Sequence, residues 1–293
     1  MIRLARAEDL TQVKALWMRA FHDAKEATDF YFENRMPLPS LLDNLLIDME
    51  GGVLRGMLSL LPLQLAVNGR RYAARYFFAI ATDERFRRQG ISTALIEEAK
   101  RLTLKRGGHA ALLVPASGAL FDFYARRGFE TLFIYEEKTV SAGDIPPRPE
   151  GARLWRADSA SDVFALREAA FRGSGVFASW DEEALGFVIR ASEAWDAPFL
   201  RFSWGGGEGC AYCEREGDTA FVKELALCGI SLQDALPIIH SEIGAARYKM
   251  RLMADRHADK SSLRPYGMIA WLKPPECAPA PGGAAPYLGF GKD

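Results

Sequence analysis

The sequence has few cysteines, no marked excess of charge and no long apolar segment. Its net charge is -1 and the two signs are interspersed, which disfavours a surface for nucleic acid or for membrane lipids. No apolar run approaches the roughly 20 residues that a membrane-spanning helix needs. Charged residues at Arg3, Arg6, Glu8 and Asp9 interrupt any apolar core of a signal peptide, so we expect a cytoplasmic protein.

The four cysteines include one pair with the spacing of a redox or metal site, Cys210-x-x-Cys213. A zinc site of this kind needs a second pair at a suitable distance, and none follows. His240 and His257 are not clustered with the pair either. We therefore expect both thiols to be free on a strand, and we predict no metal site.

The most informative segment joins a predicted strand at 79–82 to a predicted helix. The helix has apolar residues at helical spacing from Ile91 onward and ends at Gly107-Gly108. The turn before it contains Arg87, Arg88 and Gly90. A helix N-terminus presents unpaired N–H groups and about half a positive charge, and a glycine lets a phosphate approach the backbone without a Cβ in the way. The segment therefore favours an anion-binding turn, although many turns of this composition bind nothing.

Further elements follow this turn in a definite order. A short apolar strand at 109–114 is followed by a predicted helix at 117–127. That helix ends in Tyr124-Ala125-Arg126-Arg127-Gly128-Phe129, where Gly128 is placed as a left-handed helix terminator. A strand at 132–138 completes the unit.

This order resembles the GNAT superfamily of N-acetyltransferases. The signature of that family is (Arg/Gln)-x-x-Gly-x-(Gly/Ala), followed after the next helix by a Tyr and, shortly after it, Gly-Phe. Arg87 and Gly90 match the signature, and Ser92 stands where the family usually has Gly or Ala. The resemblance covers about residues 1–140. It implies an α/β (α+β) fold, in which a mixed twisted sheet has helices on both faces, and acetyl-CoA as the cofactor.

The resemblance also implies which residues bind acetyl-CoA. The backbone of Ile80, Ala81 and Thr82 would pair with the pantetheine arm, and Tyr124 would lie beside the thioester sulfur. The pyrophosphate would be held at the turn and the first helical turn, by Arg87, Arg88, Gln89, Gly90, Ile91, Ser92 and Thr93.

Length and patterning predict two domains, at 1–140 and 152–273, joined by a linker at 141–151 that is rich in Gly and Pro. The segment 152–158 is similar to 2–8, and an amphipathic helix follows each, so the second domain is predicted to be a degenerate copy of the first. It has no Arg-x-x-Gly turn, and we do not expect it to bind the cofactor. Pro237 should kink or break a helix predicted at 231–243. Tandem chains of this kind resemble the enhanced-intracellular-survival acetyltransferases.

The segment 274–293 is a tail rich in Pro, Ala and Gly that ends in several apolar residues. Tyr287, Leu288 and Phe290 predict that the tail docks on the protein, in the cleft between the two domains; the alternative is a loosely ordered end. In the enhanced-intracellular-survival family the terminal carboxylate serves as a base at the active site. By that resemblance Asp293 is a second catalytic candidate.

Amide formation needs a base for the amine and an acid for the departing thiolate. Tyr124 is the candidate acid, because a phenol is protonated at neutral pH; the alternative is that it only packs between helix and sheet. The sequence leaves the base open among side chains of the second predicted helix region and of a later strand. These are His22, Asp23, Glu26, Asp29, Glu33, Glu136 and Glu137.

Two classes of function fit these observations. The first is an enzyme that transfers an acetyl or longer acyl group from coenzyme A to a primary amine of a small molecule or peptide. The second is a non-catalytic acyl-CoA-binding sensor or partner-recruiting module. The presence of both the turn and Tyr124 favours the enzyme.

Overall fold

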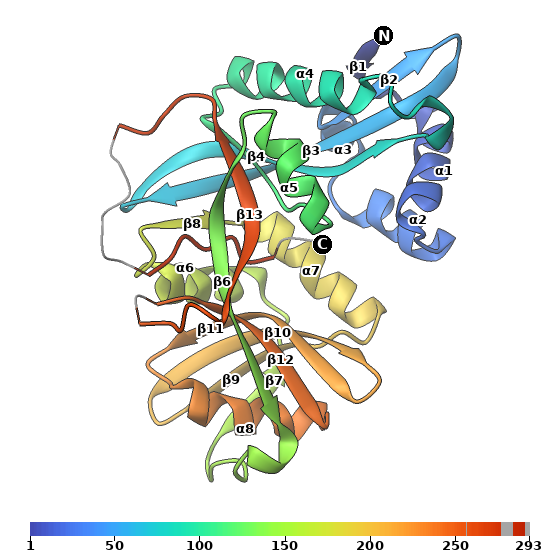
Figure 1. Cartoon of the computed structure of the whole chain (residues 1–293). Coiled ribbons are helices and arrows are strands. Elements are labelled where there is room, and N and C mark those ends of the chain that lie inside the picture. The colour runs from blue at the N-terminus through green and yellow to red at the C-terminus, as the bar shows by residue number, and fades with distance from the viewer. Residues whose placement is uncertain (256, 277–283, 291–293) are drawn as a thin grey trace. The chain divides into compact units, whose positions relative to one another are not determined.

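The computed structural model describes residues 1–255, 257–276 and 284–290 (Figure 1). By their internal contacts these residues divide into two compact units. Unit 1 comprises Met1–Leu65, Arg71–Glu130 and Met268–Glu276. Unit 2 comprises Ala66–Arg70, Thr131–Gly267 and the described residues after 277.

Unit 1 begins with a short strand and three helices that precede its long strands. The helical elements of this unit are α1 (Leu10–Phe21), α2 (Lys25–Asn34), α3 (Leu38–Asp43), α4 (Ile91–Lys105) and α5 (Gly118–Ala125). Its strands are β1 (Ile2–Leu4), β2 (Leu45–Glu50), β3 (Val53–Val67), β4 (Arg70–Thr82), β5 (Ala110–Leu113) and the second half of β13 (Leu263–Trp271).

The sheet of unit 1 has the strand order β1-β2-β3-β4-β5-β13. β4 and β5 are parallel, whereas β1–β2, β2–β3 and β5–β13 are antiparallel, so the sheet is mixed. The apolar face of α4 supplies Leu95, Ile96 and Ala99 to one core cluster, together with Leu58 and Leu60 of β3. The expected mixed α/β fold is thus confirmed, and α4 is held against this sheet by the apolar face that its sequence predicted.

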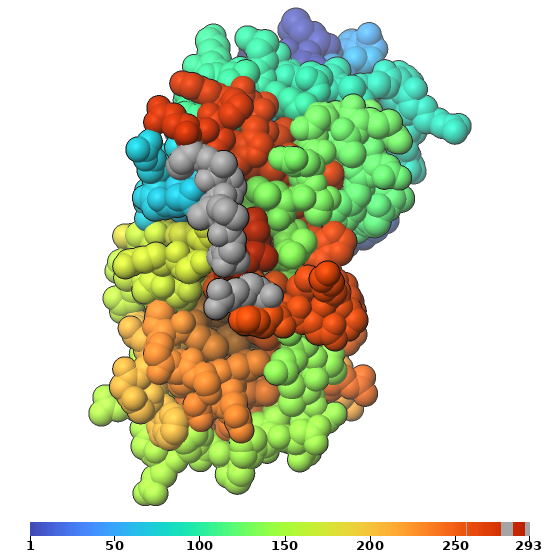
Figure 2. Space-filling model, turned by 60° about the vertical axis from the view of Figure 1, so that its left-hand side comes forward, coloured from blue at the N-terminus to red at the C-terminus, as the bar shows by residue number. Residues whose placement is uncertain are grey.

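Strand β13 enters unit 1 from far along the chain. Its residues Met268–Trp271 pair antiparallel with Leu113–Ala110 of β5. In the space-filling view, the orange-red residues that end and follow β13 lie against teal and green residues of unit 1 (Figure 2). The predicted domain ranges 1–140 and 152–273 stay a prediction.

Unit 2 repeats the alternation of helices and strands. Its helices are α6 (Ala160–Phe171), α7 (Glu182–Ala194) and α8 (Leu232–Ile243). Its strands are β6 (Glu130–Ser141), β7 (Arg153–Arg156), β8 (Val176–Ser179), β9 (Phe199–Trp204), β10 (Gly207–Glu216), β11 (Thr219–Cys228) and β12 (Arg247–Met253). Six of them follow the order β6-β12-β11-β10-β9-β7, and β11 and β12 are parallel.

Several local expectations differ from the structure. Helix α8 runs through Pro237 without a break. The carbonyl that loses its N–H partner there belongs to the exposed Gln233 in the first turn, where water can satisfy it. The elements α3, α7 and β8 were not expected from the periodicity, because each is short or lies beside other apolar segments. Among the described residues, no helix is both long and apolar enough to span a bilayer.

Candidate functional site

Strands β4 and β5 pair over a short length and then separate. Ala74, Arg75 and Tyr76 pair with Ala110, Ala111 and Leu112. β4 continues to Thr82, whereas β5 ends at Leu113. Ala79 has a φ of 52°, in the left-handed region that non-glycine residues seldom adopt, and so the strand changes its course immediately before the predicted site residues.

Asp83 holds the turn that follows β4. Its Oδ1 accepts hydrogen bonds from the backbone N–H of Arg85 at 3.1 Å and from Arg85 Nε at 2.9 Å. Its Oδ2 accepts from Arg19 Nη2 at 2.9 Å. The Arg85 side chain, supported by the Arg85 N–H and by Arg19, keeps the pKa of this buried carboxyl well below its usual range. Asp83 thereby fixes the start of the Arg87–Gly90 segment.

The N-terminus of α4 has the composition of an anion site. Gly90 is the N-cap residue with a φ of 79°, and Arg88 also has a positive φ, of 65°. The first turn contains no acidic residue, and within the described part of the chain no side chain caps the helix. Arg87 and Arg88 are exposed beside it. The free N–H groups and the positive end of the helix dipole therefore face solvent with two guanidinium groups nearby.

Arg127 adds a third guanidinium to this end of α4. Its Nε and Nη2 donate to Thr93 Oγ1 at 3.0 and 2.5 Å, and its Nη1 donates to the carbonyl of Phe123 at 2.5 Å. The guanidinium also lies 3.4 Å from the centroid of the Phe123 ring. Arg127 thus connects the first turn of α4 to the end of α5, where Tyr124 is located.

Tyr124 is buried at the end of α5, with 7% of its surface exposed. Its ring makes edge contacts with Phe123 and Phe129 at centroid distances of 5.1 and 5.9 Å. Burial raises the pKa of Tyr124 to about 12, and the nearby Arg127 opposes that rise. The phenol is therefore protonated at neutral pH and is surrounded mainly by apolar groups.

The predicted cofactor residues lie close to one another in unit 1. A Cβ added to Gly56 of β3 would be 2.8 Å from Ile91 Cγ2 and 3.0 Å from the Ala81 carbonyl oxygen, so β4 and α4 approach each other there. Ile91 and Tyr124 belong to the same apolar cluster, and Ile80 packs against it. The hydroxyl of Thr82 is buried and, among the described residues, has no hydrogen-bond partner.

Sequence reasoning missed Asp83, Gly56 and Arg127. Asp83 had a signal, since Asp directly before a tight turn is a common capping residue. Gly56 lies inside a strand, which often indicates a close approach of another element. Arg127 had no signal beyond its place near Gly128, because its partner Thr93 is distant in sequence.

The candidate bases are dispersed. Asp23 accepts a hydrogen bond from Trp17 Nε1 at 2.7 Å. Asp29 lies between Lys14 and Lys25, at 2.7 and 2.5 Å, and these lysines lower its pKa. His22, Glu26 and Glu33 are exposed on or beside α2, and Glu136 and Glu137 belong to unit 2. Asp293 lies outside the described residues.

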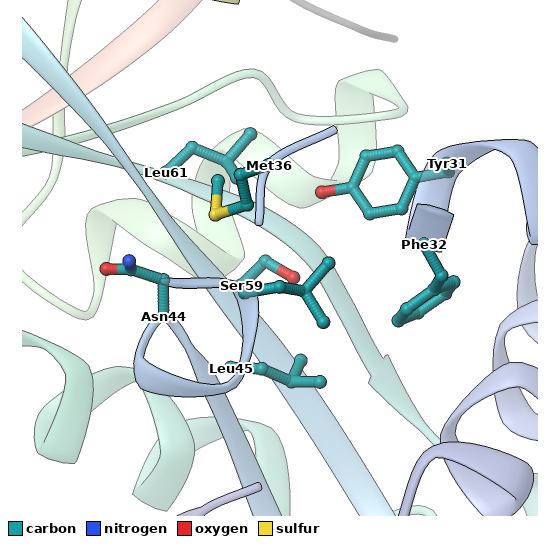
Figure 3. A pocket seen from close by; sticks show the side chains of 8 residues that line it. Tyr31, Phe32, Met36, Asn44, Leu45, Ser59 and Leu61 are labelled. Atoms are coloured by element: carbon teal, nitrogen blue, oxygen red, sulfur yellow. The ribbon is translucent and has the colours of Figure 1, made fainter. Parts of the chain in front are cut away.

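A small pocket lies next to α2 in unit 1. Its wall contains Tyr31 and Phe32 of α2, Met36, Asn44 and Ser59, with further apolar residues at Leu41, Leu45 and Leu61. Figure 3 shows the Tyr31 hydroxyl directed toward the side of Met36 and Ser59. Burial raises the pKa of Tyr31 to about 12, and the charge of Arg35 and a hydrogen bond with Ser59 oppose the rise. The pocket is thus mainly apolar with a few polar groups.

The cysteine pair lies elsewhere, on β10 of unit 2. Cys210 and Cys213 are both free and buried. Burial raises the pKa of Cys213 to about 12, so this thiol is protonated at neutral pH and a poor metal ligand. Within the described ranges, no group of three or more His, Cys, Asp or Glu side chains has the arrangement of a metal site.

Comparison with known proteins agrees with this geometry. Residues 1–132 match the family model of the acetyltransferase (GNAT) domain. The amino-terminal part of the chain is therefore a GNAT domain. No curated protein matches the chain in sequence.

Solved structures with the same fold cover nearly the whole chain. A GCN5-related N-acetyltransferase from Anabaena variabilis has 14% identity and a TM-score of 0.74, covering 93% of this chain and 73% of that one. Eis1 from Mycobacterium abscessus has 17% identity and a TM-score of 0.68, covering 93% and 74%. N-myristoyltransferase from Saccharomyces cerevisiae, with bound myristoyl-CoA, has 11% identity and a TM-score of 0.58, covering 92% and 82%.

Proposed function

We propose that this protein transfers an acetyl group from acetyl-CoA to a primary amine of a small molecule or peptide. The observation that supports this most is the arrangement in unit 1. The separated end of β4, the uncapped N-terminus of α4 and the buried phenol of Tyr124 all border one apolar cluster. The GNAT family match of residues 1–132 agrees with it.

The residues present fit coenzyme A. β4 extends past its pairing with β5, so its backbone at Ile80–Thr82 could pair with the amides of a pantetheine arm. At Gly90, no described atom lies within 4 Å of the place that a Cβ would take, which leaves space for a pyrophosphate at the helix N-terminus. Arg87 and Arg88 would add charge attraction. The unpartnered hydroxyl of Thr82 is available as a further donor.

Acetyl-CoA supplies the acyl thioester, and the chain's own residues supply position and protons. Tyr124 holds a proton at neutral pH, because its pKa is about 12, and it is the proposed donor of a proton to the departing thiolate. A phenolate then forms at Tyr124. The Arg127 guanidinium stabilises this anion, since it is the cation that lowers the pKa of Tyr124. The apolar neighbours Phe123 and Phe129 exclude water from the phenol.

A base must also take a proton from the attacking amine. The proposed candidates are Asp23, which lies in unit 1, and Asp293, which the family resemblance suggests. Asp29 is a weaker candidate, because two lysines already stabilise its charge.

The test is an assay of thiol release from acetyl-CoA over a panel of polyamines, aminoglycosides, amino acids and peptides. We expect turnover with at least one class of amine. Tyr124→Phe should lower kcat by roughly 10²-fold or more and leave the Kd for coenzyme A nearly unchanged, because the ring remains. Tyr72→Phe is the matched control, since Tyr72 is a buried tyrosine at the other end of β4. Coenzyme A binding without thiol release for any amine would instead support the non-catalytic module.

A further inference from the structure

The segment 284–290 packs within unit 2 and pairs with it through isolated β-bridges. It forms parallel bridges with β8 and the residues before it, Ser174 with Ala284 and Phe177 with Tyr287. The Tyr287 N–H donates to the Val176 carbonyl at 2.9 Å, and the Ala178 N–H donates to the Tyr287 carbonyl at 2.9 Å. The predicted docking of the tail is thus confirmed for Tyr287 and Leu288, which are buried beside β8. Its location in a cleft between the two domains stays a prediction.

Further contacts of the segment come from the region of the two parallel strands of unit 2. β11 and β12 pair only over Thr219–Val222 and Arg247–Met250. Beyond that pairing, the Ala285 N–H donates to the carbonyl of Ala254, just after β12, at 2.8 Å. The Phe290 N–H donates to the carboxylate of Glu224 on β11. The segment therefore lies where the two parallel strands separate.

In unit 1 the corresponding place lies between β4 and β5, which also pair briefly and then separate. There the separated strand end borders the site proposed for coenzyme A. The same feature, two parallel strands that pair briefly and then separate, thus borders the proposed cofactor site in unit 1 and the peptide segment in unit 2.

Each apolar residue of the segment has a defined place in unit 2. Tyr287 and Leu288 are 4% and 1% exposed. The Tyr287 ring lies 4.4 Å from the Phe171 ring, and Trp180 Nε1 donates to the Leu288 carbonyl at 3.3 Å. The Phe290 ring lies 5.6 Å from the ring of Phe199.

A buried ion pair forms the base of this site. Arg167 of α6 donates from Nε and Nη2 to the Glu224 carboxylate at 2.5 and 3.0 Å, and both residues are almost fully buried. The Arg167 guanidinium lies between the rings of Phe171 and Phe290, at 5.3 and 5.0 Å.

Gly289 fits directly over this pair. Its φ is 69°, and a Cβ there would stand 2.2 Å from Glu224 Oε2 and 2.6 Å from Arg167 Nη2. Because both atoms belong to the buried pair, neither can move aside easily. Unit 2 therefore accommodates glycine at this position and disfavours residues that have a Cβ.

We infer that unit 2 is a peptide-binding site for an extended Tyr-Leu-Gly-Phe segment, occupied in this chain by its own residues 287–290. The same segment offered by a separate molecule binds the site once the covalently attached one is displaced. This binding does not depend on acyl transfer in unit 1.

The test uses the full chain with Gly289→Ala, which displaces the attached segment and leaves the site itself unchanged. A fluorescent peptide with the sequence of residues 284–290 should bind this variant with a stoichiometry of one. In the unaltered protein the attached segment competes at a millimolar effective concentration, so the peptide should bind roughly 10²-fold more weakly. Gly143→Ala is the control, because Gly143 is in unit 2, has no described neighbour within 4 Å of its Cβ position, and should leave binding as in the unaltered protein.

Two further measurements test whether the peptide occupies the place of the attached segment. The peptide should raise the Tm of the Gly289→Ala protein, and a peptide that itself contains alanine at the glycine position should not. Hydrogen exchange at residues 287–290 should be faster in the variant than in the unaltered protein. Unchanged exchange there, equal binding of both peptides, or no binding to the variant would each overturn the inference.

Discussion

Gly90 and Gly107 offer a matched pair of substitutions for testing the cofactor site. They lie at opposite ends of α4 and have φ values of 79° and 78°. Among the described residues, no atom lies within 4 Å of a Cβ built at either position. An alanine at either place therefore meets the same backbone strain and no steric clash.

The expected effects separate stability from binding. A left-handed alanine costs about 1–2 kcal/mol, so Gly90→Ala and Gly107→Ala should lower the free energy of unfolding by similar amounts. Only at Gly90 does the added methyl group stand where a phosphate would reach the N–H groups of the helix. Loss of one charge-assisted hydrogen bond is worth about 1.5–3 kcal/mol, which corresponds to a roughly 10- to 100-fold rise in the Kd for coenzyme A.

Titration calorimetry of the full chain with coenzyme A gives the affinity, and urea unfolding gives the stability. We expect one coenzyme A per chain, a weakened site in Gly90→Ala and a change below about twofold in Gly107→Ala. Equal affinities in the two variants would refute the placement of the pyrophosphate at this helix end. A stoichiometry of two would refute its restriction to unit 1.

Three other outcomes follow from buried charges and phenols. The pKa of Asp83 is depressed, so its contribution to stability is present above its ordinary pKa of about 3.9 and is lost as the pH falls further. Asp83→Asn should therefore lower the free energy of unfolding by about 1.5–3 kcal/mol at pH 7. Urea unfolding should show that this difference shrinks in acid. Arg167→Met should cost about 3–5 kcal/mol because it leaves the buried Glu224 carboxyl without its cation. Replacing both residues with apolar ones should cost less than half as much, and equal losses would contradict this. The pKa values of Tyr31 and Tyr124 are about 12, above the ordinary 10. Each should therefore contribute about 2–3 kcal/mol to the free energy of unfolding that is lost as the pH rises from 10 to 12. A Phe variant of either should lose less stability over this range.

Local patterns in the sequence predicted much of unit 1. The strand before Arg87, the turn at Gly90 and the helix from Ile91 depend on short-range geometry, which spacing and glycine placement express directly. The pairing of β13 with β5 could not be predicted in this way, because a strand pattern indicates that a strand exists and not which strand it pairs with.

The site in unit 2 illustrates the same limit. Arg167 and Glu224 are 57 residues apart, and each has the sequence context of a solvated side chain on an amphipathic element. Composition predicted that the apolar tail residues would be buried, because exposed aromatic residues lose the free energy of burial. It could not identify β8 as their partner, since β8 itself is only four residues long.

The position of β13 has a consequence for how the protein is made. The edge of β5 is completed by residues that leave the ribosome only after more than half of the chain has followed Leu113. At a synthesis rate of about 5–20 residues per second, this edge of β5 stays unpaired for roughly ten to thirty seconds. During that interval it is exposed to pairing with other nascent chains, so a fragment that stops before Met268 should aggregate during expression.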